Sequence, residues 1–298
     1  MGADIKSLRT RIKSVSSTLQ LTKAMGLVAS SKIRKAQLVR SCALEYASSV
    51  SSIVDLLTSS RECAKSPYLQ DRDGVSKIII IAGDRGLAGG YNANVFRFAR
   101  EFSDVELLPI GKKSCEKYSK TVISSEHFSH SDAMALSTEL CRDFKEGKYA
   151  RVGIIYTKYV SMLSQIPEIK WVLPLTKGEK AFTGGAIFEP DEITMLERSI
   201  PSYVAGHLYA CVKESFACEV VARRSAMDSA GKNATAMIDE LMLKYNRARQ
   251  GSITQEITEI VAGSDGNSQW GSQLCFSLWK SYIFPLGCDI FLQAKMTK

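Results

Sequence analysis

A heptad pattern runs through the first sixty residues and constrains the fold more than any other feature of the sequence. Sixteen apolar or small positions step by three and four residues without a proline, and only Arg40 among them is charged. They are Ile5, Leu8, Ile12, Val15, Leu19, Thr22, Gly26, Ala29, Ile33, Ala36, Arg40, Ala43, Ala47, Val50, Val54 and Leu57. At about 1.5 Å per residue this predicts one helix about 80 Å long. The period of 3.5 residues further predicts a left-handed coiled coil with a second helix.

The partner helix is expected near the other end of the chain, although a second copy of the chain is an alternative source. From Ser199-Ile200-Pro201, where proline suits a first helical turn, no further proline occurs before Val261. Apolar or small residues recur there at Tyr203, Val212, Phe216, Met227, Ala230, Ala234, Met237, Leu241, Tyr245 and Ala248. Two long helices at opposite ends of one chain pair most economically as an antiparallel coiled coil.

Between these helices the hydrophobic period changes, which indicates a different kind of domain. Four short apolar runs, "VSKIIIIAG", "VELLPIG", "ARVGIIYT" and "KWVLPL", read as strands and alternate with three helical stretches. This alternation predicts a small, Rossmann-like parallel sheet covered on both faces. The expected fold is α/β, with a coiled-coil helix over 1–60, a central domain over 75–195 and a second coiled-coil helix over 199–263.

The stretch "KIIIIAGDRGLAGGYN", residues 77–92, raises the question of nucleotide binding. A phosphate loop needs a lysine and a hydroxyl residue after its last glycine, but Tyr91 and Asn92 follow Gly90 here. The spacing of Gly83, Gly86 and Gly89 does not fit the dinucleotide fingerprint either. A tight turn that brings backbone close to another surface is therefore favoured. An anion site at the glycine-rich helix start stays open as the alternative.

Charge is concentrated at the amino end. Residues 1–40 hold nine lysines and arginines against a single acid, Asp4, so their surplus of +8 equals that of the whole chain. A basic face of this kind suits nucleic acid or anionic lipid, or is simply a solvated helix face. The eight cysteines form no CxxC pair and the three histidines lie near none of them, so no metal site is predicted. The first residues also lack the apolar region of a signal peptide.

Four stretches carry a family resemblance. They are "IKSLRTRIKSVSSTLQLTKAMGLVASSKIRKAQ" (5–37), "GDRGLAGGYN" (83–92), "YTKYVSML" (156–163) and "AMDSAGKNATAMIDELMLKYNRARQGSITQEITEIVAG" (226–263). Together they resemble the gamma subunit of the bacterial F-type ATP synthase, in the right order over about residues 3–265. The resemblance implies a rotor shaft that couples c-ring rotation, driven by the proton gradient, to conformational changes at the catalytic beta subunits. It further implies a peripheral position on the cytoplasmic side of the cell membrane.

The resemblance also implies which residues meet other subunits. "RARQGSITQE" matches a stretch that contacts a beta-subunit loop, which would involve Arg249, Gln250, Thr254 and Glu256. Arg223 and Met25 match positions near the beta lever loop, and "GDRGLAGGYN" would bring Asp84, Arg85 and Ala88 to the same interface. Phe188 and Glu189 match a segment near the c-ring. The alternative is a solvated helix face for the "RARQGSITQE" residues, plain coiled-coil packing for Met25 and a strand-end turn for Phe188 and Glu189.

The family is non-catalytic, so the resemblance implies no catalytic residue, no cofactor and no metal ligand. The implied partners are the alpha and beta subunits, the epsilon subunit and the c-ring, with no nucleic acid and no membrane span. Two functions of other classes remain as alternatives. A nucleotide-dependent enzyme would need the lysine or glycine spacing that is missing, and a nucleic-acid-binding helical hairpin would use the basic residues 6–40.

Residues 264–298 depart from the family, whose members usually end soon after "EIVAG". Between residues 274 and 292, thirteen of nineteen residues are apolar, but they are interrupted by Lys280, Pro285, Gly287 and Asp289. A membrane helix needs about twenty mostly apolar residues, so no span is predicted. A shifted reading frame or a loosely ordered extension are the two interpretations of this atypical tail.

Overall fold

The computed structural model describes every residue except 1, 61, 104, 177–187 and 265–298. The chain forms two compact units. The larger unit comprises residues 20–232. The smaller unit joins the residues up to 19 to those from 233 onward.

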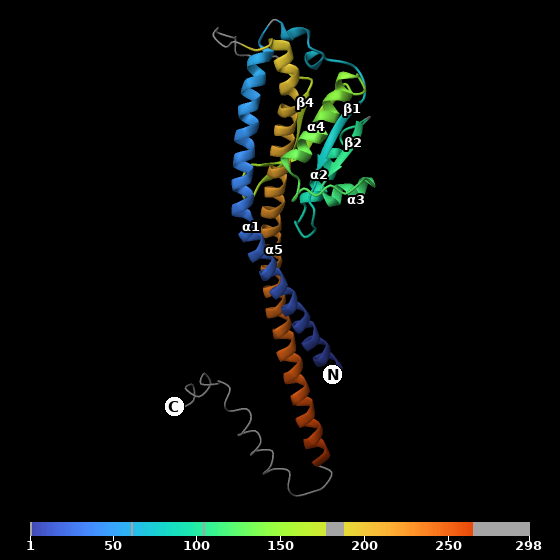
Figure 1. Ribbon diagram of the computed structural model, residues 1–298. Coiled ribbons are helices and arrows are strands. Elements are labelled where there is room, and N and C mark those ends of the chain that lie inside the picture. Colours follow the sequence, from blue (N-terminus) through green and yellow to red (C-terminus); the bar gives the residue numbers. More distant parts are fainter. Residues whose placement is uncertain (1, 61, 104, 177–187, 265–298) are drawn as a thin grey trace, which may run out of the picture. The chain divides into compact units, whose positions relative to one another are not determined.

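Two long helices, α1 (Gly2–Thr58) and α5 (Glu192–Ser264), confirm the predicted helical ends of the chain. Every described heptad position is buried or half-buried, as a coiled-coil seam requires. Within the larger unit the two helices run side by side and antiparallel, as Figure 1 shows. Gly26 faces Met227, and further along α1 Arg40 pairs with Glu214. Small residues at the seam, such as Ala43 and Ala47, are buried where the helices approach closely.

Helix α5 begins seven residues before the predicted start, with Pro201 inside the helix rather than in its first turn. Asp191 caps the observed start, because its carboxylate accepts a hydrogen bond from Thr194 N–H at 3.2 Å. Proline inside a helix removes one hydrogen bond and costs about 3 kcal/mol. Leu196, among the added residues, and Ile200, just after them, are fully buried, and their burial offsets this cost.

The smaller unit contains the first part of α1 and the last part of α5. Ala234 and Leu241 are buried there, and the heptad positions from Ile5 to Leu19 are half-buried. Beyond residue 248, nearly every position of α5 is exposed, including the large apolar residues Ile253 and Ile257. Contacts within the described part of the smaller unit therefore leave this end of α5 largely uncovered.

The central sheet has four strands in the order β2, β1, β3, β4. They are β1 (Ser76–Ile81), β2 (Val105–Ile110), β3 (Arg151–Tyr159) and β4 (Gln165–Leu173). The first three are parallel, as predicted, but β4 pairs antiparallel with β3 and starts five residues earlier than expected. Ser161 makes the reversal, because its hydroxyl accepts from Leu163 N–H and Ser164 N–H at 3.3 and 3.0 Å. The sheet is therefore mixed rather than wholly parallel.

Both faces of the sheet are covered, as predicted. On one face Ile79, Ile81 and Ile154 pack with α1, α5 and α4 (His130–Lys145) in the main core. On the other face Ile78 and Ile80 pack against α2 (Tyr91–Ala99), with α3 (Lys112–Tyr118) following β2. Short 3-10 turns, Cys63–Lys65 and Pro67–Leu69, connect α1 to the sheet. The carboxyl ends of β1 and β3 consequently lie beside α5.

Candidate functional site

The glycine-rich loop, residues 83–90, leads from β1 into α2 and packs against α5. A Cβ atom at Gly83 would lie 2.7 Å from Cδ of Glu219, so only glycine fits without a shift. The N–H groups of Asp84 and Arg85 both donate to the Glu219 carboxylate at 3.3 Å. The Glu219 carboxylate thus accepts the hydrogen bonds of loop N–H groups that would otherwise be free to bind a phosphate. The structure bears out the tight turn and leaves these two groups unavailable to an anion.

Arg223, one turn further along α5, fastens the same loop. Its guanidinium pairs with Glu219 and donates to the carbonyl oxygens of Arg85 and Gly86 at 3.4 and 3.3 Å. Only 11% of its side chain is exposed. Arg223 therefore lies beside the predicted interface, but most of its donors are used inside the chain.

Asp84 has an internal role that the sequence did not reveal. Its carboxylate accepts hydrogen bonds from Lys112 N–H, Ser125 N–H and Glu126 N–H at 2.9 to 3.0 Å, and from the Ser124 hydroxyl at 2.7 Å. Burial opposes ionisation, but the hydrogen bonds outweigh it and hold the pKa of Asp84 below its usual value. Asp84 fixes the segment before α4 and the start of α3, so its side chain does not point to a partner.

The outward face of the loop borders a cavity of about 370 Å³ between the loop, α1 and α5. Met25, Asp84, Arg85 and Arg223 all line it, so the structure brings these four predicted residues together. Leu87 lines it as well, with 62% of its surface exposed and a φ of 61°. A leucine held exposed in the left-handed region is costly, and such residues cluster at functional sites. We call Met25, Val28, Lys32, Arg85 and Leu87 the Met25 surface.

Sequence reasoning missed Leu87 as a surface residue and Glu219 as the anchor of the loop. A leucine between glycines carries no sign of whether it is packed or exposed. Glu219 lies in a long helix among many charged residues, and 135 positions separate it from Asp84. The available signal was the glycine spacing itself, which indicated a close approach without naming the surface.

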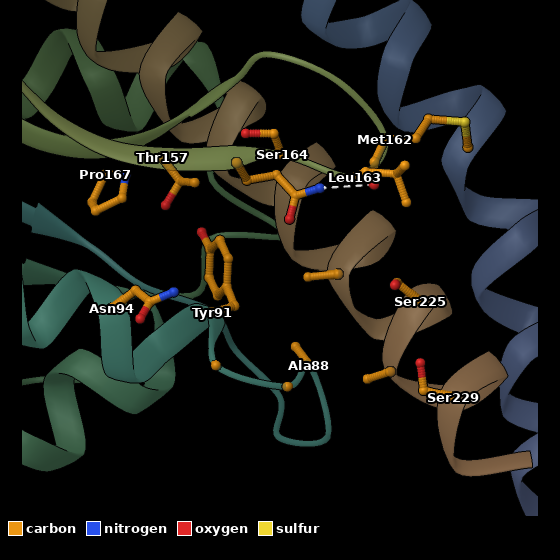
Figure 2. Close-up of a pocket in the computed structure, with 15 residues that line it drawn as sticks. Ala88, Tyr91, Asn94, Thr157, Met162, Leu163, Ser164, Pro167, Ser225 and Ser229 are labelled. Carbon is orange, nitrogen blue, oxygen red and sulfur yellow. Dashed lines mark hydrogen bonds between the residues drawn. The ribbon is translucent and has the colours of Figure 1, made fainter. Parts of the chain in front are cut away.

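A second cavity, also of about 370 Å³, lies on the other side of the loop (Figure 2). Asn94, Thr157, Ser164, Ser225 and Ser229 give it a polar but uncharged lining, closed by Met162 and Leu163 of the β3–β4 turn. Ala88 lies at its edge and is buried against Tyr91 and Cys218. The predicted contact of Ala88 with another subunit would therefore rest on the loop backbone rather than on the methyl group.

The remaining predicted interface residues lie elsewhere. Phe188 is half-buried and packs against the main core, whereas Glu189 is exposed. The other four, in the smaller unit, are all exposed on α5: Arg249, Gln250, Thr254 and Glu256. Phe188 thus has an internal packing role, and the other five side chains are accessible within the described chain.

Polar side chains of α5 also hold the carboxyl end of β3. Glu214 accepts from Arg40 Nη2 at 2.9 Å and from Tyr159 N–H at 3.1 Å. Ser215 accepts from Thr157 N–H at 3.0 Å through its hydroxyl. In α/β sheets, ligands bind outside the carboxyl ends of the parallel strands. Here Glu214, Ser215 and Glu219 engage backbone N–H groups at that edge, and the second cavity lies beside them.

His207 is a buried titratable group of α5 that lies beside Lys170 of β4. Its Nε2 lies 2.8 Å from Ser51 Oγ and its Nδ1 lies 3.0 Å from Lys170 Nζ. Burial, followed by the nearby Lys170 charge, lowers the pKa of His207 from 6.5 to about 3. The imidazole is therefore neutral at physiological pH.

This shift predicts acid sensitivity. The unfolded chain binds a proton at this histidine below about pH 6.5, but the folded chain does not until about pH 3. The free energy of unfolding thus decreases as pH falls through this window, by up to about 1.4 kcal/mol per pH unit. Urea unfolding of the full chain at pH 7, 6 and 5 should show that His207→Gln removes this contribution. His127→Gln, at an exposed histidine, is the control. If the free energy of unfolding depends equally on pH in the wild type and both variants, the pKa assigned to His207 is wrong.

Within the described residues, no group of histidine, cysteine and acidic side chains is arranged to hold a metal ion. Nor does any helix in that part of the chain have the length and apolar character needed to cross a bilayer. The atypical tail falls outside the described residues, apart from Ser264 at the end of α5.

The geometry defines a class of protein in which two long terminal helices pack antiparallel and one of them is hydrogen-bonded to the carboxyl edge of an α/β domain. A family model described as ATP synthase matches residues 4–266. A gamma chain of ATP synthase from Ruminococcus albus is 37% identical over 88% of this chain and 98% of its own length. One from Moorella thermoacetica is 37% identical over 88% and 99%. The chain therefore belongs to the ATP synthase gamma-chain family.

Two solved structures share the fold of this chain. A chain from the Euglena gracilis mitochondrial ATP synthase, in a structure of OSCP, F1 and c-ring, superposes with a TM-score of 0.62. It is 17% identical and covers 92% of this chain and 99% of its own. A chain from the Tetrahymena thermophila central stalk and c-ring has a TM-score of 0.57 at 21% identity, covering 70% and 99%. The family match ends at residue 266, so nearly all of the tail lies beyond it.

Proposed function

We propose that this chain is the central rotor shaft of a proton-translocating F-type ATP synthase. It couples rotation of the c-ring to conformational changes at the catalytic beta subunits, and carries out no bond chemistry itself. Membership of the gamma-chain family over residues 4–266 is the observation that carries this proposal. The contacts of α5 with the carboxyl edge of the sheet support it, because Glu214, Ser215 and Glu219 engage backbone N–H groups that a phosphate could otherwise bind.

Physical reasoning explains why such a subunit needs long paired helices. Moving one charge through 100 mV yields only about 2.3 kcal/mol, so the work of several protons must be summed for each ATP. A shaft can deliver that sum only if it does not bend or slip. Within the larger unit, buried small residues let α1 and α5 pack closely, and Arg40 pairs with Glu214 across them.

The Met25 surface is the proposed contact with the beta lever loop. It combines the apolar side chains of Met25, Val28 and Leu87 with the cations of Lys32 and Arg85. Lys32 pairs with Glu126 at 2.6 Å, whereas Arg85 is mostly exposed and only 3.7 Å from the same carboxylate. A partner segment that offers apolar and acidic side chains would fit this combination.

Further contacts are proposed at two other places. In the smaller unit, the exposed Arg249, Gln250, Thr254 and Glu256 would meet a second beta-subunit loop. Glu189, with its neighbour Phe188, would lie near the c-ring, and the central domain would also contact epsilon. The assembled chain would then lie on the cytoplasmic side of the cell membrane as a peripheral subunit.

Co-expression with alpha and beta subunits of a bacterial relative tests the proposal. We expect one copy of this chain to join each alpha–beta hexamer and to restore ATP turnover that the hexamer lacks alone. Purification by a tag on beta, followed by native mass spectrometry, measures the stoichiometry. A folded chain that never joins the hexamer would contradict the proposal, and saturable ATP binding by the isolated chain would favour an enzyme instead.

A further inference from the structure

A separate cluster of polar groups lies between α1, α5 and the strand pair β3 and β4. It lines a cavity of about 420 Å³ in the larger unit and does not include the glycine-rich loop. We propose that this cavity binds a small oxyanion with the size and charge of inorganic phosphate. Lys170 of β4 is its principal ligand, assisted by the hydroxyl groups of Tyr156 and Ser48.

Lys170 supplies a positive charge that the described part of the chain does not neutralise. Its ammonium group lies 3.0 Å from His207 Nδ1, and no described carboxylate is within ion-pair distance of it. His207 Nε2 lies 2.8 Å from Ser51 Oγ, and the Ser51 hydroxyl donates to Ala47 O at 2.9 Å. This chain of bonds makes Nε2 the donor and Nδ1 the acceptor of a neutral imidazole. Two N–H groups of Lys170 therefore remain for a ligand.

Two hydroxyl groups add neutral donors to the same cavity. Tyr156 is opposite Glu168 in the β3–β4 pairing, and its side chain is buried in the wall of the cavity. Ser48 faces the cavity from α1. In the described chain, neither hydroxyl has a hydrogen-bond partner. An ammonium group with hydroxyl donors nearby matches an oxyanion, whose oxygens accept several hydrogen bonds at once.

The acidic groups near the cavity do not oppose an anion strongly, because each is paired. Glu214 also lines the cavity, but Arg40 and Tyr159 N–H bind its carboxylate. Glu168 forms an ion pair with Lys158 at 3.0 Å. Because both carboxylates are paired with other cations, neither neutralises the charge of Lys170. A half-buried ammonium in this position is costly unless a counter-ion joins it.

Titration of the full-length chain with inorganic phosphate tests the proposal, at constant ionic strength with chloride as the balancing ion. Calorimetry should show saturable binding at one site, and the melting temperature should rise with phosphate. Lys170→Gln should weaken binding by about tenfold or more, which corresponds to loss of one charge-assisted hydrogen bond. Tyr156→Phe should weaken it by a smaller factor. Lys65→Gln, which removes an exposed charge elsewhere in the larger unit, should leave it unchanged.

A spectroscopic measurement locates the site independently of affinity. Phosphate should shift the NMR signals of the His207 imidazole and leave those of the exposed His127 in place. Circular dichroism confirms that the Lys170→Gln protein is folded before it is titrated. Equal phosphate affinity in the wild type and Lys170→Gln would overturn the proposal, as would the absence of saturable binding by the wild type.

Discussion

Asp84→Ala is expected to lower the free energy of unfolding of the larger unit by about 3–5 kcal/mol. The substitution leaves three backbone N–H groups without their acceptor, at Lys112, Ser125 and Glu126. Each unsatisfied donor that stays buried costs about 1–3 kcal/mol, and partial access of water reduces the sum. Hydrogen exchange of the amides of β1 and β3 under increasing urea measures the loss.

Two control substitutions test this prediction: a conservative change at Asp84 itself and the removal of an exposed carboxylate elsewhere. Asp84→Asn keeps the shape and one accepting oxygen, so it should cost less than Asp84→Ala. Asp71→Ala removes a carboxylate that is 72% exposed and pairs with Arg151 at 3.3 Å, and should change stability by less than about 1 kcal/mol. A loss at Asp84→Ala no greater than at Asp71→Ala would show that the hydrogen-bonded position of Asp84 is wrong.

Met25→Lys is expected to weaken coupling between ATP hydrolysis and proton pumping in the assembled enzyme. The substitution adds a cation to a surface that already carries Lys32 and Arg85. If an acidic beta-subunit loop lies against this surface, the new charge adds about 1–4 kcal/mol of attraction in one orientation of the rotor. The rotor must overcome this attraction to leave that orientation, so coupled turnover should slow by about fivefold or more. Proton transport per ATP hydrolysed, measured in membrane vesicles, gives the result.

Met25→Leu is the matched control, because it keeps an apolar side chain of similar volume. It should pump as well as the wild type. High salt should partly restore Met25→Lys, since it screens exposed charges. Undiminished pumping by an assembled Met25→Lys enzyme would place the beta lever loop away from Met25.

Long-range regularity made the helices predictable. The heptad spacing identified the buried positions of α1 without reference to any partner, because a helix repeats its faces by number alone. The limits of α5 were harder to foresee. Pro201 suggested a start at residue 199, but burial of Leu196 and Ile200 extends the helix back to Glu192. Tertiary packing therefore decided the boundary against the local preference of proline.

The sheet and the site show where sequence reasoning stops. The turn before β4 is held by the Ser161 hydroxyl and contains no glycine, proline or asparagine. Serine is a weaker turn signal than these residues, so the reversal to an antiparallel strand was not evident from the sequence. In the loop, the glycines predicted a close approach but not Glu219 as its target. Asp84 and Arg85 are neighbours in sequence, yet one side chain points inward and the other outward. Neighbouring residues of a loop have no periodicity from which to predict this difference.

The closure of the strand ends by α5 also has a mechanical consequence. Apolar contacts are only weakly directional, so a small axial shift of a helix costs less where only such contacts hold it than where hydrogen bonds are added. Hydrogen bonds depend steeply on angle and distance. Glu214, Ser215 and Glu219 bind backbone N–H groups of two different segments, so any axial slip of α5 would stretch all of these bonds together. The joint between helix and sheet is thus stiff against shear, and torsion applied to the domain would pass into the helix with little loss.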